Sequence, residues 1–164
     1  MIRSCSGLLL LALIAGCGRT QPAVEKRTAA PADTEAVADT LREPSNEEAA
    51  GVIRAYYTAI NARRYADAYV LWSGRGERSG QTLDSFTVGF AQTDSVHADI
   101  GAPSDMDAAA GSRYITVPVK LVAYEGKRTQ SFAGTYTLRR AVVDGATAEQ
   151  RRWRIEGAAI RRRR

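Results

Sequence analysis

Few residues of this 164-residue chain have the chemistry of a catalytic or metal-binding site. The single histidine, His97, stands two positions before Asp99, and side-chain alternation along a strand would place both on one face. Such a pair could act as an acid–base dyad, although a polar row on a half-exposed strand has the same spacing. The only cysteines are Cys5 and Cys17, so no zinc site is expected, and we expect no metal and no cofactor.

The first seventeen residues have the features of a bacterial secretory leader. A positive start at Met1–Arg3 precedes an apolar stretch, Gly7–Ile14, and the small residues that a signal peptidase requires. The junction Ile14-Ala15-Gly16-Cys17 resembles the bacterial lipobox, in which the cysteine sulfur receives a diacylglycerol and the leader is cut before it. This resemblance predicts a signal peptide over residues 1–16 and lipidation of Cys17.

Lipidation of Cys17 would fix the compartment of the protein. Several acyl chains on one cysteine hold a protein stably on a membrane, because each buried methylene contributes about 0.8 kcal/mol. Gly18 follows the cysteine where an Asp would signal retention, which resembles Gram-negative lipoproteins sorted to the outer membrane. We therefore expect a lipid-anchored, periplasm-facing protein of the outer membrane. An ordinary secreted protein that keeps or discards Cys17 is the alternative.

Residues 17–45 are predicted to be the lipidated cysteine and a flexible tether. The segment after Cys17 holds six Ala, four Thr, three Pro and nine charges, and it has no aromatic residue. Such a composition buries too little apolar surface to offset the entropy of ordering the chain. As a flexible coil the segment would reach roughly 30 Å.

All twelve aromatic residues lie between Tyr56 and Trp153, so the folded domain is expected over residues 46–160. Ser45 and Glu48 have capping-box spacing, and the apolar residues after them recur at helical intervals. The same periodicity predicts a first helix over residues 46–61 and a second over residues 65–73, followed by a loop over residues 74–80. A third helix is predicted to be capped by Thr82 and to present Leu83, Phe86 and Phe90 to the core.

From Ser95 the period of the apolar residues changes to two, which predicts strands. Inward-facing sets are Val96, Ala98 and Ile100; then Ile115, Val117, Val119 and Leu121; then Phe132, Gly134, Tyr136 and Leu138; and finally Trp153 and Ile155. Glu125 and Gly126 suit a tight turn, and Pro118 predicts a bulge or an edge. The second and third strands, over 113–121 and 128–140, hold no carboxylate. The fold class is therefore α+β, with an antiparallel meander after the helices.

Residues 46–160 resemble the nuclear transport factor 2-like superfamily. The resemblance rests on the stretch from Val52 to Trp72, V-I-R-A-Y-Y-T-A-I-N-A-R-R-Y-A-D-A-Y-V-L-W, and on a late hairpin closed by Trp153-Arg154-Ile155. It implies N-terminal helices packed in a strongly bent antiparallel sheet, a cystatin-like cone with a pocket. A lipocalin-like domain or another small α+β domain is the alternative. Related domains often pair through their sheets, so the resemblance leaves a homodimer open.

Aromatic side chains are the expected lining of such a pocket, and a packed core has the same composition. The leading hypothesis is a non-catalytic domain that binds a small apolar ligand or an envelope protein. The alternatives are a pocket enzyme of the isomerase or dehydratase type that uses Asp99 or His97, and a structural adaptor with a filled core. The candidate pocket residues are Tyr57, Tyr69, Trp72, Phe86, Phe90, Phe132 and Tyr136.

The excess of positive charge lies at the C-terminus. Residues 151–164 hold seven Arg and one Glu, whereas residues 46–150 hold 11 basic and 12 acidic side chains. Arg161, Arg162, Arg163 and Arg164 form a basic tail that an anionic membrane surface would attract, at about 1 kcal/mol per charge, unless it is only solvated. No basic stripe with interleaved aromatics runs through the domain, so nucleic acid is not an expected partner.

Replacing Cys17 by Ala should remove the acyl mass and release the protein from the membrane fraction, because no other residue of the junction can carry the lipid. Intact-mass spectrometry and membrane fractionation measure both effects. A wild-type mature protein that begins after Gly18 without lipid would contradict the anchor.

Overall fold

The computed structural model describes residues 45–104 and 106–164. The predicted leader, Cys17 and the tether up to residue 44 lie outside the described residues, and their assignments stay predictions. In the described part, helices come first and an antiparallel sheet follows, so the predicted α+β class is confirmed. No helix in this part of the chain is long and apolar enough to cross a bilayer.

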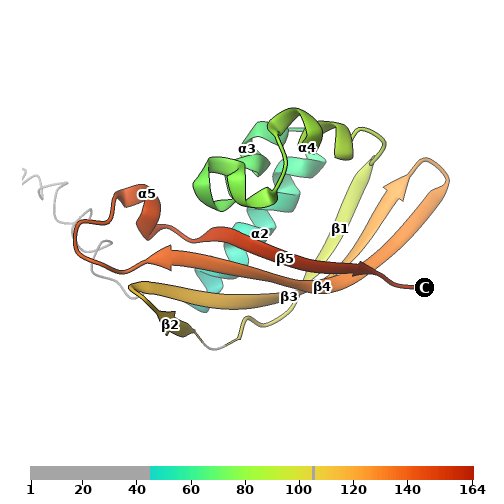
Figure 1. Cartoon of the computed structure of the whole chain (residues 1–164). Helices are drawn as coiled ribbons and strands as arrows, with labels where there is room; N and C mark the ends of the chain where they lie inside the picture. Colours follow the sequence, from blue (N-terminus) through green and yellow to red (C-terminus); the bar gives the residue numbers. More distant parts are fainter. Residues whose placement is uncertain (1–44, 105) are drawn as a thin grey trace, which may run out of the picture. The chain divides into compact units, whose positions relative to one another are not determined.

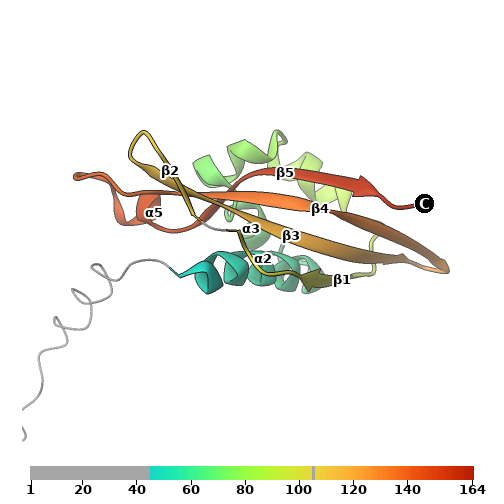
Figure 2. The same ribbon diagram turned by 90° about the horizontal axis from the view of Figure 1, so that it is seen from below.

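Helix α2 (Asn46–Asn61) has the bounds that the sequence predicts. The hydroxyl of Ser45 accepts the N–H of Glu48 at 3.2 Å, which satisfies a backbone donor of the first turn. At the other end, the Asn61 side chain donates to the carbonyl of Val96 at 2.9 Å and accepts the N–H of Val96 at 2.7 Å. These two bonds fix the helix along strand β1 (Ser95–Ile100), where Figure 2 shows it.

The second predicted helix is shorter than the sequence indicates. Helix α3 covers only Tyr65–Tyr69. The next residues pair with the sheet instead, because Ile155 donates its N–H to the carbonyl of Leu71 at 2.9 Å and Trp72 forms a parallel bridge with Ile155. The prediction that this helix continues to residue 73 is therefore wrong. The backbone at residues 71 and 72 hydrogen-bonds to the edge strand β5 instead of continuing the helix.

The predicted loop is the segment η1 (Ser73–Ser79), in which 3-10 turns flank a left-handed kink. Gly76 has a φ of 111°, and a Cβ on it would lie 1.9 Å from the ring of Tyr69. Only glycine fits this position, and the kink brings the chain back toward helix α4.

Helix α4 (Leu83–Gly89) is capped as predicted, because the Thr82 hydroxyl accepts the N–H of Ser85 at 3.2 Å. Phe86 is buried as predicted, whereas Leu83 is 38% exposed. The prediction that Leu83 faces the core is therefore wrong: the helix is only two turns long and buries one narrow stripe.

The main sheet has the antiparallel order β1-β3-β4-β5, with β3 at Ser112–Glu125, β4 at Arg128–Ala141 and β5 at Arg154–Arg162. Figure 1 shows α3 and α4 above one face, with the β3–β4 hairpin bending toward them. We call this face the inner face; it carries the buried residues Ile115, Val117, Val119 and Leu121, as predicted. Strand β2 (Asp107–Ala109) and helix α5 (Ala148–Arg151) were not predicted, because such short elements show no periodicity.

Pro118 lies in an unbroken part of the β3–β4 register, opposite Thr135. Its carbonyl accepts the N–H of Gly101 at 2.9 Å, on the side of β1. In an antiparallel strand the N–H and the carbonyl of one residue point to the same side. An N–H at position 118 would therefore also point to the β1 side, just beyond the end of β1 at Ile100, so the sheet loses no bond there. The predicted edge position is thus correct and the predicted bulge is not. The register shift lies instead opposite Thr137, between β4 and β5.

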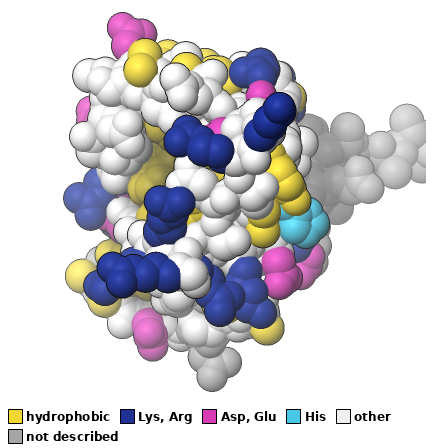
Figure 3. Space-filling view, turned by 90° about the vertical axis from the view of Figure 1, so that its right-hand side faces the viewer, with side chains coloured by type: hydrophobic (Ala, Val, Ile, Leu, Met, Phe, Trp, Pro, Cys, Tyr) yellow, Lys and Arg dark blue, Asp and Glu magenta, His cyan; other side chains and the backbone are white. Residues whose placement is uncertain are grey.

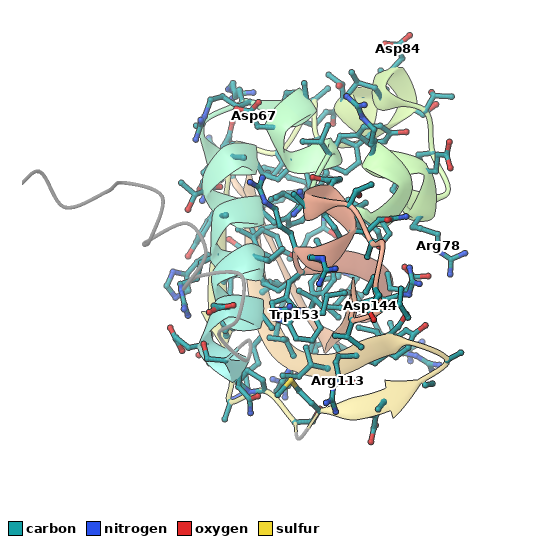
Figure 4. All side chains as sticks on the ribbon, turned by 90° about the vertical axis from the view of Figure 1, so that its left-hand side faces the viewer. Asp67, Arg78, Asp84, Arg113, Asp144 and Trp153 are labelled. Carbon is teal, nitrogen blue, oxygen red and sulfur yellow. The ribbon has the colours of Figure 1, made fainter. Side chains whose placement is uncertain are left out.

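Strand β5 continues past residue 160, so Arg161 and Arg162 are strand residues rather than tail. The N–H of Arg163 still bonds to the carbonyl of Ser131 at 2.7 Å. Trp153 stands just before the strand, 3% exposed, among the interior side chains beside α2 in Figure 4.

Replacing Trp153 by Ala should lower the free energy of unfolding by about 3–5 kcal/mol, because the substitution leaves a large cavity in a small core. Trp153→Phe is the matched control: it keeps an aromatic ring and removes an indole N–H that is buried without an acceptor. Urea denaturation followed by circular dichroism measures both. Equal losses in the two variants would contradict a packing role.

Candidate functional site

Aromatic rings from the helices and from β4 form one connected group on the inner face. Neighbouring rings lie 5.0 to 6.3 Å apart between centroids, in edge-on or tilted contact. Contacts of this geometry are those that aromatic rings prefer in protein cores. This aromatic cluster consists of Tyr56, Tyr57, Tyr69, Trp72, Phe86, Phe90 and Tyr136.

The structure brings six of the seven predicted pocket residues into this cluster, and the seventh, Phe132, lies further along β4. The residues that are buried are Tyr57, Trp72, Phe86 and Tyr136, and those that are half-buried are Tyr69, Phe90 and Phe132. The middle of the inner face is therefore filled by the protein's own rings. The aromatic surface of the inner face that stays accessible to solvent belongs to Tyr69, Phe90 and Phe132.

Two tyrosine hydroxyl groups meet inside the cluster. The Oη atoms of Tyr57 and Tyr136 are 2.6 Å apart, and one donates to the other. Burial raises the pKa of both hydroxyl groups and also that of Tyr56. All three phenols are therefore neutral hydrogen-bonding groups near neutral pH, and none can serve as a phenolate base.

Trp72 adds a polar group to the cluster. Its side chain is 8% exposed, and it makes a side-chain hydrogen bond with Tyr56, which lowers the pKa of that phenol against the larger rise caused by burial.

A hollow opens at the hairpin end of the inner face. In Figure 3 hydrophobic side chains form its floor, and Lys and Arg side chains stand around it. Half-buried hydrophobic residues of this end include Phe132 and Ile160, which share the inner face with Leu121 by strand register. From the helical side, Phe90 stacks on Tyr65 with centroids 6.2 Å apart and planes at 14°. Apolar surface is therefore left accessible at this end.

Glu125 is a carboxylate that sequence reasoning missed. The β3 strand extends to Glu125, beyond the predicted end at residue 121, and alternation places it on the inner face with Leu121. It accepts from Gln130 Nε2 at 2.7 Å and from Arg128 Nη2 at 3.1 Å. The ion pair closes the hairpin. Continuing the period of two past Leu121 would have found it.

Three other carboxylates, on α3, α4 and β5, are exposed or ion-paired. Asp67 and Asp84 are exposed on the outside of α3 and α4 (Figure 4). Glu156 is held by Arg78, with its Oε1 2.9 Å from Nη2.

His97 and Asp99 point to the outer face of the sheet, as alternation predicts, and both are exposed. They line an open groove of about 650 Å³ over β1, β3 and β4, together with Lys120, Arg54 and Arg163. The Asp99 carboxylate lies 4.0 Å from the Lys120 ammonium group. Alternation points both side chains away from the face that carries Tyr136, while Leu121 and Phe132 also line this groove.

Comparisons with known proteins give matches in structure. No protein-family model matches the chain, and no curated protein matches its sequence. One similar solved structure is a proposed dehydratase of the nuclear transport factor 2-like family from Streptomyces avermitilis, with 15% identity, a TM-score of 0.48, and coverage of 70% of this chain and 92% of that one. Another is a proposed scytalone dehydratase from Novosphingobium aromaticivorans, with 11% identity, a TM-score of 0.49, and coverage of 80% and 88%.

At these identities and TM-scores, the activities of the two proteins give no argument for this chain. The confirmed architecture rests on the element order and strand register described above: N-terminal helices, then a curved antiparallel sheet.

The tyrosine pair can be tested by a double-mutant cycle. Tyr57→Phe and Tyr136→Phe should each cost about 1–3 kcal/mol of unfolding free energy, because each leaves the partner hydroxyl buried without a bond. The double variant should cost clearly less than the sum, since no orphan hydroxyl remains. Urea denaturation measures all four proteins, and strictly additive losses would show that the pair is not coupled.

Proposed function

We propose that this protein is a lipid-anchored, periplasm-facing domain of the outer membrane that binds a small apolar ligand without chemistry. The anchor is Cys17, and the binding site is the hollow at the hairpin end of the inner face. The observation that carries the proposal is the apolar floor of that hollow, with cationic side chains around it (Figure 3).

The half-buried aromatic residues support this site. Phe132 and Phe90 pack against the core without being enclosed by it, so a ligand can cover their accessible surface. Covering apolar surface contributes roughly 25 cal/mol per Å², and the filled aromatic cluster behind them supplies a rigid wall. Because the phenols of Tyr57 and Tyr136 satisfy each other, the wall presents apolar ring surface to the ligand.

The positions of the acid–base groups support binding rather than catalysis. By strand alternation the residues of the enzyme alternative, His97 and Asp99, point away from the face that carries Tyr136. On the inner face the Glu125 carboxylate is held by Arg128 at 3.1 Å and by Gln130 at 2.7 Å. An adaptor with a filled core remains the competing function, and an envelope protein remains the competing ligand.

A neutral fluorophore, N-phenylnaphthylamine, tests the site in the Cys17→Ala protein, which should need no detergent. The protein should bind the probe, and Phe132→Ala should weaken binding about tenfold, because a covered Phe side chain contributes roughly 1.5–3 kcal/mol. Val143→Ala is the matched control, since Val143 is 45% exposed and follows the far end of β4.

Native mass spectrometry of the wild-type protein in mild detergent should also detect an apolar molecule carried through purification. A protein that binds no probe and carries no ligand has a filled core, and the adaptor function would then replace the proposal. Equal binding by Phe132→Ala and Val143→Ala would place the ligand elsewhere.

A further inference from the structure

A second hollow, independent of the proposed apolar site, lies at the opposite end of β4. It has a volume of about 230 Å³ and is lined by five arginines and one glutamate, a formal net charge of +4. The arginines come from η1, from the end of β4, from the segment that joins α5 to β5, and from the first residue of β5. We call this site the arginine pocket; its charged residues are Arg75, Arg139, Arg140, Arg152, Arg154 and Glu149.

Strand register places these charges against one another. Arg139 lies directly opposite Arg154 across β4 and β5, and Arg140 lies opposite Arg113 across β4 and β3. Like charges in directly opposed positions destabilise a sheet. Alternation points these two pairs to opposite faces of the sheet, so an anion in the pocket would act on the Arg139–Arg154 pair.

The pocket's own carboxylate neutralises one arginine. Glu149 accepts from Nε of Arg154 at 2.8 Å and from Nη2 of Arg154 at 2.7 Å, so one guanidinium fork engages both carboxylate oxygens. Arg154 holds the pKa of Glu149 below its ordinary value, and the charges of Arg152 and Arg75 lower it further. The last two arginines are thus close enough to act on an anion in the pocket.

The remaining donors are held in place by neutral groups. Arg139 donates from Nε to the hydroxyl of Ser112 at 3.0 Å. The guanidinium carbon of Arg140 lies 6.0 Å from the ring centroid of Trp153, in cation–π contact. The Ser112 contact orients Arg139 through a neutral hydroxyl, which is the preorganisation that anion binding requires, and the Trp153 contact orients Arg140.

The number of arginines around the pocket distinguishes between classes of anion. A carboxylate has two coplanar oxygens and is matched by one guanidinium fork, as Glu149 shows with Arg154. Guanidinium groups that line one pocket from three separate segments suit a tetrahedral oxyanion, which offers acceptor oxygens in several directions. The volume of 230 Å³ is below the roughly 300–1,000 Å³ of pockets for drug-sized ligands, so it fits a small group.

We propose that the arginine pocket binds a phosphate group, through the guanidinium groups of Arg75, Arg139 and Arg152. Inorganic phosphate and the phosphate of a lipid headgroup have the same chemistry at this site, and the experiment below distinguishes the two sources.

The test is isothermal titration of the full-length protein in a neutral sugar detergent. Sodium phosphate is compared with sodium acetate at matched ionic strength. Phosphate should bind, and Arg75→Gln and Arg152→Gln should each weaken it about tenfold, as expected for the loss of one charge-assisted contact. Both side chains are exposed, so folding should survive, and circular dichroism checks this. Arg161→Gln removes the same charge outside the pocket and should change the affinity less than about twofold.

A short-chain phosphatidic acid, titrated below its micelle concentration, identifies the source of the phosphate. Binding much tighter than that of inorganic phosphate assigns a lipid headgroup, and equal binding assigns free phosphate; both support the pocket. The proposal is overturned if acetate binds as well as phosphate, or if Arg75→Gln and Arg152→Gln behave like Arg161→Gln. If the protein binds no apolar probe, this test still stands, because the arginine pocket and the apolar site consist of different residues.

Discussion

The backbone hydrogen bond from Ile155 to Leu71 joins the helical half of the chain to the sheet. Because of this bond, α3 ends after five residues and Trp72 forms a parallel bridge with Ile155 beside β5. Trp72 is thereby drawn into the aromatic cluster, and the chain leaves the sheet through the kink at Gly74–Gly76. The kink in turn places Arg75 at the arginine pocket. Both candidate sites therefore depend on this one junction between a loop carbonyl and an edge strand.

Local signals predicted the long elements well. The capping residue Ser45 and the helical spacing after it were sufficient for α2, and the period of two on β3 was sufficient for the inner face. Both signals lie within a few residues of the structure that they specify. The end of α3 could not be predicted in this way, because its cause is Ile155, more than eighty residues later in the chain.

The candidate sites were predictable to different extents. Aromatic residues at core spacing identified the cluster, but composition cannot tell which rings are enclosed and which stay accessible; burial separates Tyr136 from Phe132 on the same face of β4. The arginine pocket gave no signal, since Arg75 and Arg154 meet only in three dimensions. Sequence reasoning counted positive charge toward the C-terminal tail, whereas the structure gathers much of it at the end of β4.

The two hydrogen bonds between the Asn61 side chain and the Val96 backbone affect how another strand could pair with the sheet. The Asn61 amide hydrogen-bonds to both the N–H and the carbonyl of Val96 on the edge strand β1, as the backbone of a neighbouring strand would. At the other edge, Leu71 does the same for the N–H of Ile155. Unpaired strand edges are where β-proteins add further chains and aggregate. At Val96 and Ile155, therefore, these edge groups are already bonded within the domain and are not free to pair with an added strand.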